Sequence, residues 1–87
     1  MNPVVRIAVL GAAGRMGRAV IQAAAQAGLP LGAAFERAGA PELGRDAGEL
    51  AGLDTRGVLI TADVAAAAAR FDVLIDFTRP EATLTAL

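Results

Sequence analysis

Three glycines spaced three residues apart, directly after an apolar segment, are the residues of this sequence best suited to chemistry. Gly11, Gly14 and Gly17 form the pattern G-x-x-G-x-x-G within VRIAVLGAAGRMG. Glycines at a strand-to-helix turn let backbone N–H groups approach a phosphate, and the helix N-terminus favours negative charge there. The pattern therefore predicts a site for the pyrophosphate of a dinucleotide. The residues expected to surround it are Gly11, Ala12, Ala13, Gly14, Arg15, Met16 and Gly17.

Each glycine has a distinct expected role in such a turn. Gly11 permits the tight turn, Gly14 allows the pyrophosphate to come close, and Gly17 lets the helix pack on the strand. The alternative is a glycine-rich turn without a ligand in an apolar protein. The strand expected before the pattern and the helix expected after it favour the phosphate site.

An acidic residue lies at the distance that a ribose-binding carboxylate would have. Glu36 follows Gly11 by 25 residues, at the expected end of the second strand, and would accept hydrogen bonds from the adenosine ribose. Arg37, next to it, and Arg15 could each pair with a 2′-phosphate through the planar guanidinium. An acid beside an arginine would let one site accept NADH or NADPH. The alternative is that these are ordinary solvated surface charges.

A fourth group of candidates lies at the end of a later apolar segment. Residues 76–79 would lie at the carboxyl end of a strand, where ligands bind in open α/β sheets. Phe77 could pack on a cofactor ring, and Thr78 or Arg79 could contact its phosphate or ribose. The alternative is a helix capping box, Thr78 to Glu81, with Phe77 in the core.

The composition offers no catalytic constellation and no metal site. The chain has 87 residues and contains neither cysteine nor histidine, so disulfides, thiolate ligands and the commonest general base are excluded. A net charge of −1 without a basic block argues against nucleic acid as a partner. No apolar run spans a bilayer and no signal peptide is expected, which indicates a soluble cytoplasmic protein without a membrane partner.

The hydrophobic pattern predicts an α/β protein with a Rossmann-like parallel sheet of about four strands and flanking helices, an incomplete version of that fold. The whole chain is expected to be the N-terminal part of a dinucleotide-binding domain. Residues 38–57 are expected to form a long surface excursion with a helical turn near residues 46–50. The expected strands are residues 4–10, 29–35, 58–61 and 72–77. The expected helices are residues 14–27, residues 64–70 capped by Asp63, and a last helix after Pro80 that continues through Leu87.

Four segments together resemble one enzyme family. These segments are GAAGRMGR at 11–18, GAAFER at 32–37, GRDAGELAG at 44–52 and DFTRPEATL at 76–84. In this order they resemble the start of dihydrodipicolinate reductase, also called 4-hydroxy-tetrahydrodipicolinate reductase. This enzyme of the bacterial diaminopimelate and lysine pathway reduces a cyclic dicarboxylate with NADH or NADPH. The resemblance covers essentially the whole chain.

The resemblance implies that residues 12–17 hold the pyrophosphate, Glu36 the ribose and Arg37 the 2′-phosphate of NADP. It also implies a second α/β domain that binds the dicarboxylate substrate, carries the histidine and lysine residues and builds a homotetramer. None of that domain's blocks is found in this sequence, so the chain is expected to hold cofactor without turning over substrate. The alternatives are a non-catalytic nucleotide-binding Rossmann module or sensor, and an inert fragment that aggregates through an open sheet edge.

Overall fold

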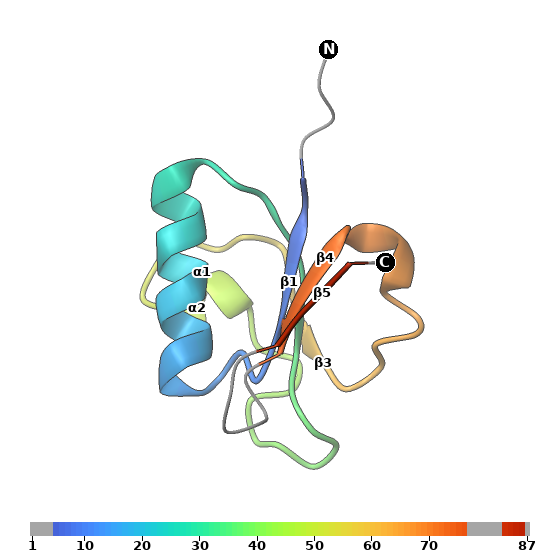
Figure 1. Cartoon of the computed structure of the whole chain (residues 1–87). Helices are drawn as coiled ribbons and strands as arrows, with labels where there is room; N and C mark the ends of the chain where they lie inside the picture. Colours follow the sequence, from blue (N-terminus) through green and yellow to red (C-terminus); the bar gives the residue numbers. More distant parts are fainter. Residues whose placement is uncertain (1–4, 77–82, 87) are drawn as a thin grey trace.

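A five-stranded sheet with the order β3-β2-β1-β4-β5 organises the chain (Figure 1). The computed structural model describes residues 5–76 and 83–86. The first four strands are parallel, as the sequence predicts, and β5 is antiparallel to β4. The strands are β1 (Ile7–Leu10), β2 (Leu31–Phe35), β3 (Ile60–Thr61), β4 (Val73–Asp76) and β5 (Thr83–Ala86).

The order of the strands creates a switch point between β1 and β4. From β1 the chain moves outward through β2 to β3, then crosses back to place β4 on the other side of β1. The central strands are short and apolar, and Ala8 and Val9 are fully buried on opposite faces of the sheet. Burial on both faces explains why the strand segments lack a polar–apolar alternation.

The first helix, α1 (Arg15–Ala27), connects β1 to β2 and confirms the predicted helix. Gly28 ends it in the left-handed conformation, with φ of 75°, and its N–H donates to the carbonyls of Ala24 and Ala25. A left-handed residue at this position favours glycine. Ile21 and Ala24 are the larger of the buried residues that α1 turns toward the sheet.

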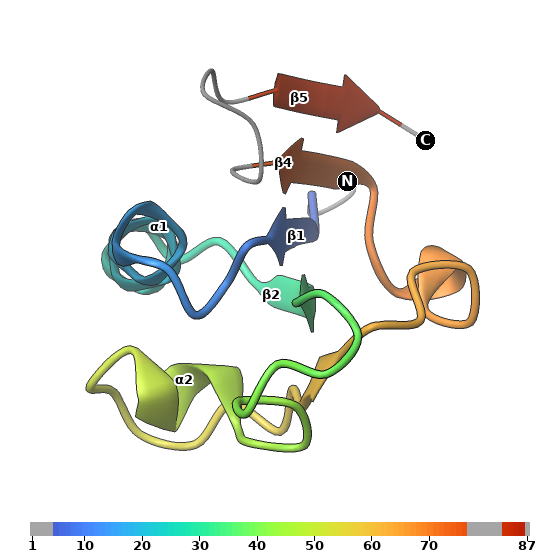
Figure 2. The same ribbon diagram turned by 90° about the horizontal axis from the view of Figure 1, so that it is seen from below.

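Two separate cores cover the two faces of the sheet. Figure 2 shows α1 and α2 (Ala47–Leu50) on one side and the short helix η1 (Ala68–Arg70) on the other. On the η1 side, the rings of Phe35 and Phe71 meet edge to face with centroids 5.7 Å apart. The core on the α1 side contains Val9, Ala12, Ile21, Ala34, Ala47, Ala51 and Ile60.

The excursion after β2 is held together by one carboxylate. Asp46 caps α2 by accepting from the N–H groups of Gly48 and Glu49, and it also accepts from those of Arg56 and Gly57. The predicted helical turn near residues 46–50 is thus confirmed. Desolvation acts to raise the pKa of Asp46, but the four backbone N–H bonds together hold that pKa below its ordinary value.

The predicted helix at residues 64–70 forms only in part. Residues 64–67 make turns and only Ala68–Arg70 are helical, as the 3-10 helix η1. The predicted cap is present, because Asp63 Oδ1 accepts from Ala66 N–H at 3.0 Å. This alanine-rich segment buries just Ala67 before Phe71, and a short helix depends on packing of an apolar face.

The predicted last helix is wrong over residues 83–86, which form β5. The register pairs Val73 with Ala86 and Asp76 with Thr83. The physical reason is the edge of β4: its backbone N–H and C=O groups need partners on the side away from β1, and β5 supplies them. The predicted capping box, Thr78 to Glu81, and Phe77 lie outside the described residues.

Replacement of Asp46 tests the role of this carboxylate in the excursion. Because folding lowers its pKa, its stabilisation is present above the ordinary carboxyl pKa and is lost as the pH falls through the lowered value. We expect Asp46→Asn to reduce the free energy of unfolding at pH 7 by about 1–2 kcal/mol, because one amide oxygen cannot accept all these bonds. In chemical denaturation, the difference from wild type should shrink below about pH 4. A difference that stays constant down to pH 2 would contradict this role.

Candidate functional site

The strand registers bring the predicted site residues together at the carboxyl edge of the sheet. Leu10, the last residue of β1, pairs with Phe35 of β2 on one side and with Asp76 of β4 on the other. Gly11 and Glu36, which follow the paired ends of β1 and β2, are therefore neighbours beside the switch point. The carboxyl ends of these strands form the lower edge of the sheet in Figure 1. Open α/β sheets bind their ligands in this position.

The glycine turn is fastened to the end of β2. Gly11 has a φ of 88°, a conformation that favours glycine. The N–H groups of Gly11 and Ala12 both donate to Phe35 O, at 2.9 and 3.1 Å, and Gly14 N–H donates to Gly11 O at 3.0 Å. The turn is therefore a defined structure that directs the start of α1.

The first turn of α1 leaves backbone donors open. Gly14 is the N-cap, it provides no side-chain cap, and no acidic residue lies in the first turn. The first bond of the helix runs from Arg18 N–H to Gly14 O, so the N–H groups of residues 15–17 have no acceptor within the helix. These donors and the positive end of the helix dipole can bind an anion. Arg15 and Met16 are both exposed there, Met16 by 59%.

Gly17 and Gly14 differ in the space that their surroundings leave for a Cβ atom. A Cβ atom on Gly17 would overlap Gly11 O and would lie 2.8 Å from Ala12 Cα, so no side chain fits between α1 and the turn. A Cβ on Gly14 would meet only Gly11 O, at 3.3 Å. The predicted packing role of Gly17 thus has a direct geometric basis, whereas the fold itself leaves Gly14 nearly enough room for alanine.

Glu36 lies beside the turn, half-buried, and its carboxylate bonds to it. Glu36 Oε2 accepts from Ala13 N–H at 2.9 Å, and Oε1 accepts from Arg37 N–H at 3.4 Å. The Arg37 side chain is exposed, and neither Arg37 nor Arg15 forms an ion pair within residues 5–76 and 83–86. Both guanidinium groups are therefore available to an anion near the turn.

Some features of this region were not predicted. The bond between Glu36 and Ala13 joins residues 23 apart, and no local pattern signals it. The same holds for Gln22, whose Nε2 donates to Ala51 O at 2.6 Å and ties α1 to the end of α2. Two predicted site residues, Phe77 and Thr78, lie outside the described residues.

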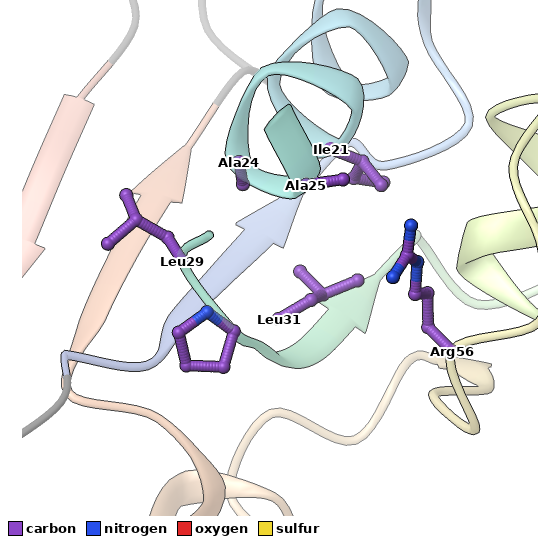
Figure 3. A pocket seen from close by; sticks show the side chains of 7 residues that line it. Ile21, Ala24, Ala25, Leu29, Leu31 and Arg56 are labelled. Atoms are coloured by element: carbon purple, nitrogen blue, oxygen red, sulfur yellow. The ribbon is translucent and has the colours of Figure 1, made fainter. Parts of the chain in front are cut away.

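Two hollows flank α1 at opposite ends. The groove in Figure 3 lies at the C-terminal end of α1, between Ile21, Leu29, Leu31 and Arg56, and is distant from the glycine turn. A second, more open groove begins next to the turn, where Arg15 and Arg18 face Ala51 and Gly52. Within the described ranges, no group of three or more metal-ligating side chains occurs. None of the helices in those ranges has the length and the continuous apolar sequence that a membrane span requires.

The parallel sheet, the glycine turn and the open start of α1 define a nucleotide-binding domain of the Rossmann-like class. Comparison with known families gives a specific assignment. The family described as "Dihydrodipicolinate reductase, N-terminus" matches residues 5–87. The chain belongs to this family, the NAD(P)-binding domain of dihydrodipicolinate reductase-like proteins, which confirms the resemblance found in the sequence.

Alanine substitutions at Gly17 and Gly14 distinguish a glycine needed for packing of α1 from one expected to leave space for the ligand. We expect Gly17→Ala to destabilise the fold by about 1–3 kcal/mol or more, because its Cβ would collide with backbone that cannot move aside. We expect Gly14→Ala to cost less than about 1 kcal/mol, the usual penalty of a poorer N-cap. Thermal and urea unfolding of both variants measure this difference. Equal losses of stability would show that the contact at Gly17 does not control the fold.

Proposed function

We propose that this chain binds the pyrophosphate and adenosine ribose of NADH or NADPH at residues 11–17 and Glu36. The observation that carries the proposal is the open first turn of α1 beside a carboxylate. Donors without acceptors in the helix suit a pyrophosphate, and a carboxylate at the end of β2 suits ribose hydroxyls.

The proposed roles divide between the backbone of the glycine turn and a small set of side chains. The N–H groups of residues 15–17 neutralise the pyrophosphate, and Gly14 lets it come close. Oε1 of Glu36 accepts from a ribose hydroxyl, since Oε2 is already bonded to Ala13 N–H. Arg37 or Arg15 pairs with the 2′-phosphate of NADPH. Phe77 and Thr78 complete the proposed contacts, on the basis of their place in the sequence directly after an apolar strand segment.

The parent protein is proposed to be an oxidoreductase of the diaminopimelate and lysine pathway, a cytoplasmic 4-hydroxy-tetrahydrodipicolinate reductase. In this proposal the 87 residues hold the cofactor and supply no proton donor, which agrees with the absence of histidine, cysteine and lysine from the sequence. The dicarboxylate substrate and the contacts of a homotetramer belong to a further domain. The bound cofactor would supply the hydride.

A non-catalytic nucleotide sensor is the second candidate, favoured by the same lack of a proton donor. Calorimetric titration of this chain with NADH would show binding for either candidate. The parent protein distinguishes them: a reductase oxidises NADPH in the presence of the dicarboxylate substrate, whereas a sensor binds the dinucleotide without consuming it.

Binding of NADPH should depend on Gly14 and Arg37 for different reasons. We expect Gly14→Ala, which the fold can accommodate, to weaken the binding of NADH and NADPH to the same extent by crowding the pyrophosphate.

We expect Arg37→Ala to weaken the binding of NADPH by about tenfold or more and that of NADH much less, because only NADPH carries the 2′-phosphate. Titration calorimetry with both cofactors measures these changes, with Arg70→Ala as a control at an exposed arginine on the η1 side. Equal losses for both cofactors in Arg37→Ala would contradict the role of Arg37.

A further inference from the structure

Three consecutive N–H groups fasten the glycine turn to the end of β2. Those of Gly11 and Ala12 donate to the backbone carbonyl of Phe35, and that of Ala13 donates to the side chain of Glu36. The first two bonds form with any residue at position 35. The third, at 2.9 Å, needs an acceptor on a side chain of the right length at position 36.

The hydrogen bond from Ala13 N–H to Glu36 holds the part of the turn next to the free N–H groups of residues 15–17. Ala13 immediately precedes Gly14, the N-cap of α1, and the free N–H groups of residues 15–17 follow at once. A turn held at Ala13 keeps these donors converging before a ligand arrives. Binding sites that are ordered in advance lose less conformational entropy on binding.

We propose that Glu36 is a positioning residue for the pyrophosphate turn, in addition to its proposed contact with the ribose, and this inference rests on the function proposed above. Its two carboxylate oxygens have different proposed roles. Oε2 holds Ala13 N–H, while Oε1, with only a long 3.4 Å bond from Arg37 N–H, remains open to a ribose hydroxyl. One side chain thereby couples the ribose subsite to the pyrophosphate subsite.

Amide hydrogen exchange in the ligand-free chain tests the positioning role directly. Glu36→Asp keeps the charge but shortens the side chain by one methylene, and Glu36→Gln keeps the length and an acceptor oxygen. We expect Ala13 N–H to exchange about tenfold faster in Glu36→Asp and within about threefold of wild type in Glu36→Gln. Gly11 N–H, bonded to a backbone carbonyl, should be unchanged and serves as the internal control.

Glu42→Ala is the control variant. It removes a half-buried carboxylate of the excursion after β2 whose side chain makes no hydrogen bond within residues 5–76 and 83–86. It should leave exchange at Ala13 unchanged. Exchange at Ala13 that is equally fast in wild type and Glu36→Asp would overturn the proposal, whether or not the chain binds a nucleotide.

Binding of a nucleotide without ribose hydroxyls separates positioning from ribose contact. We expect Glu36→Asp to weaken 2′,3′-dideoxy-ADP by about fivefold to tenfold, because the turn is less ordered, and Glu36→Gln to retain its affinity. If Glu36 contacts only the ribose, both variants should bind dideoxy-ADP with the affinity of the wild type. That result would overturn the positioning role. Failure of wild type to bind ADP at all would instead contradict the proposed function, and the exchange experiment would still decide the positioning role.

Discussion

The close contact between Gly17 and the backbone of the turn at Gly11 is the constraint on which the rest of the structure depends. It places the start of α1 directly against the end of β1, with no room for a Cβ atom. From there α1 runs back across the sheet, buries Ile21 and Ala24, and returns the chain to β2. A helix displaced outward to admit a side chain would open the core and move the open donors away from Glu36.

The candidate binding site forms at the carboxyl ends of β1 and β2, next to this contact. The register that aligns Leu10 with Phe35 sets Gly11 next to Glu36, and the hydrogen bonds from residues 11–13 join the two segments. The chain belongs to a family of NAD(P)-binding domains, which agrees with a nucleotide site in this position. The same packing that stabilises the domain therefore also orders the donors proposed to bind the cofactor.

The sequence predicted the features that depend on local chemistry and missed those that depend on distant partners. Apolar runs predicted the four parallel strands, and the glycines at 11, 14, 17 and 28 predicted the turn and both ends of α1. The alanine content of residues 64–70 and the capping pattern from Thr78 to Glu81 both predicted helices. The alanine-rich segment buries too little to form a full helix, and residues 83–86 instead pair with the edge of β4 as a strand. The contact of Glu36 with Ala13 needed the strand register, which single-residue patterns do not contain.

We propose above that a nucleotide binds at the open start of α1. The most direct measurement is a titration of ¹⁵N-labelled chain with ADP, followed by the shifts of its backbone amide signals. We expect the largest shifts on residues 11–17 and on Glu36 and Arg37, at the carboxyl edge of the sheet. Shifts centred instead on Ile21, Leu29 and Leu31, the groove at the other end of α1, or no shifts at millimolar ADP, would contradict it.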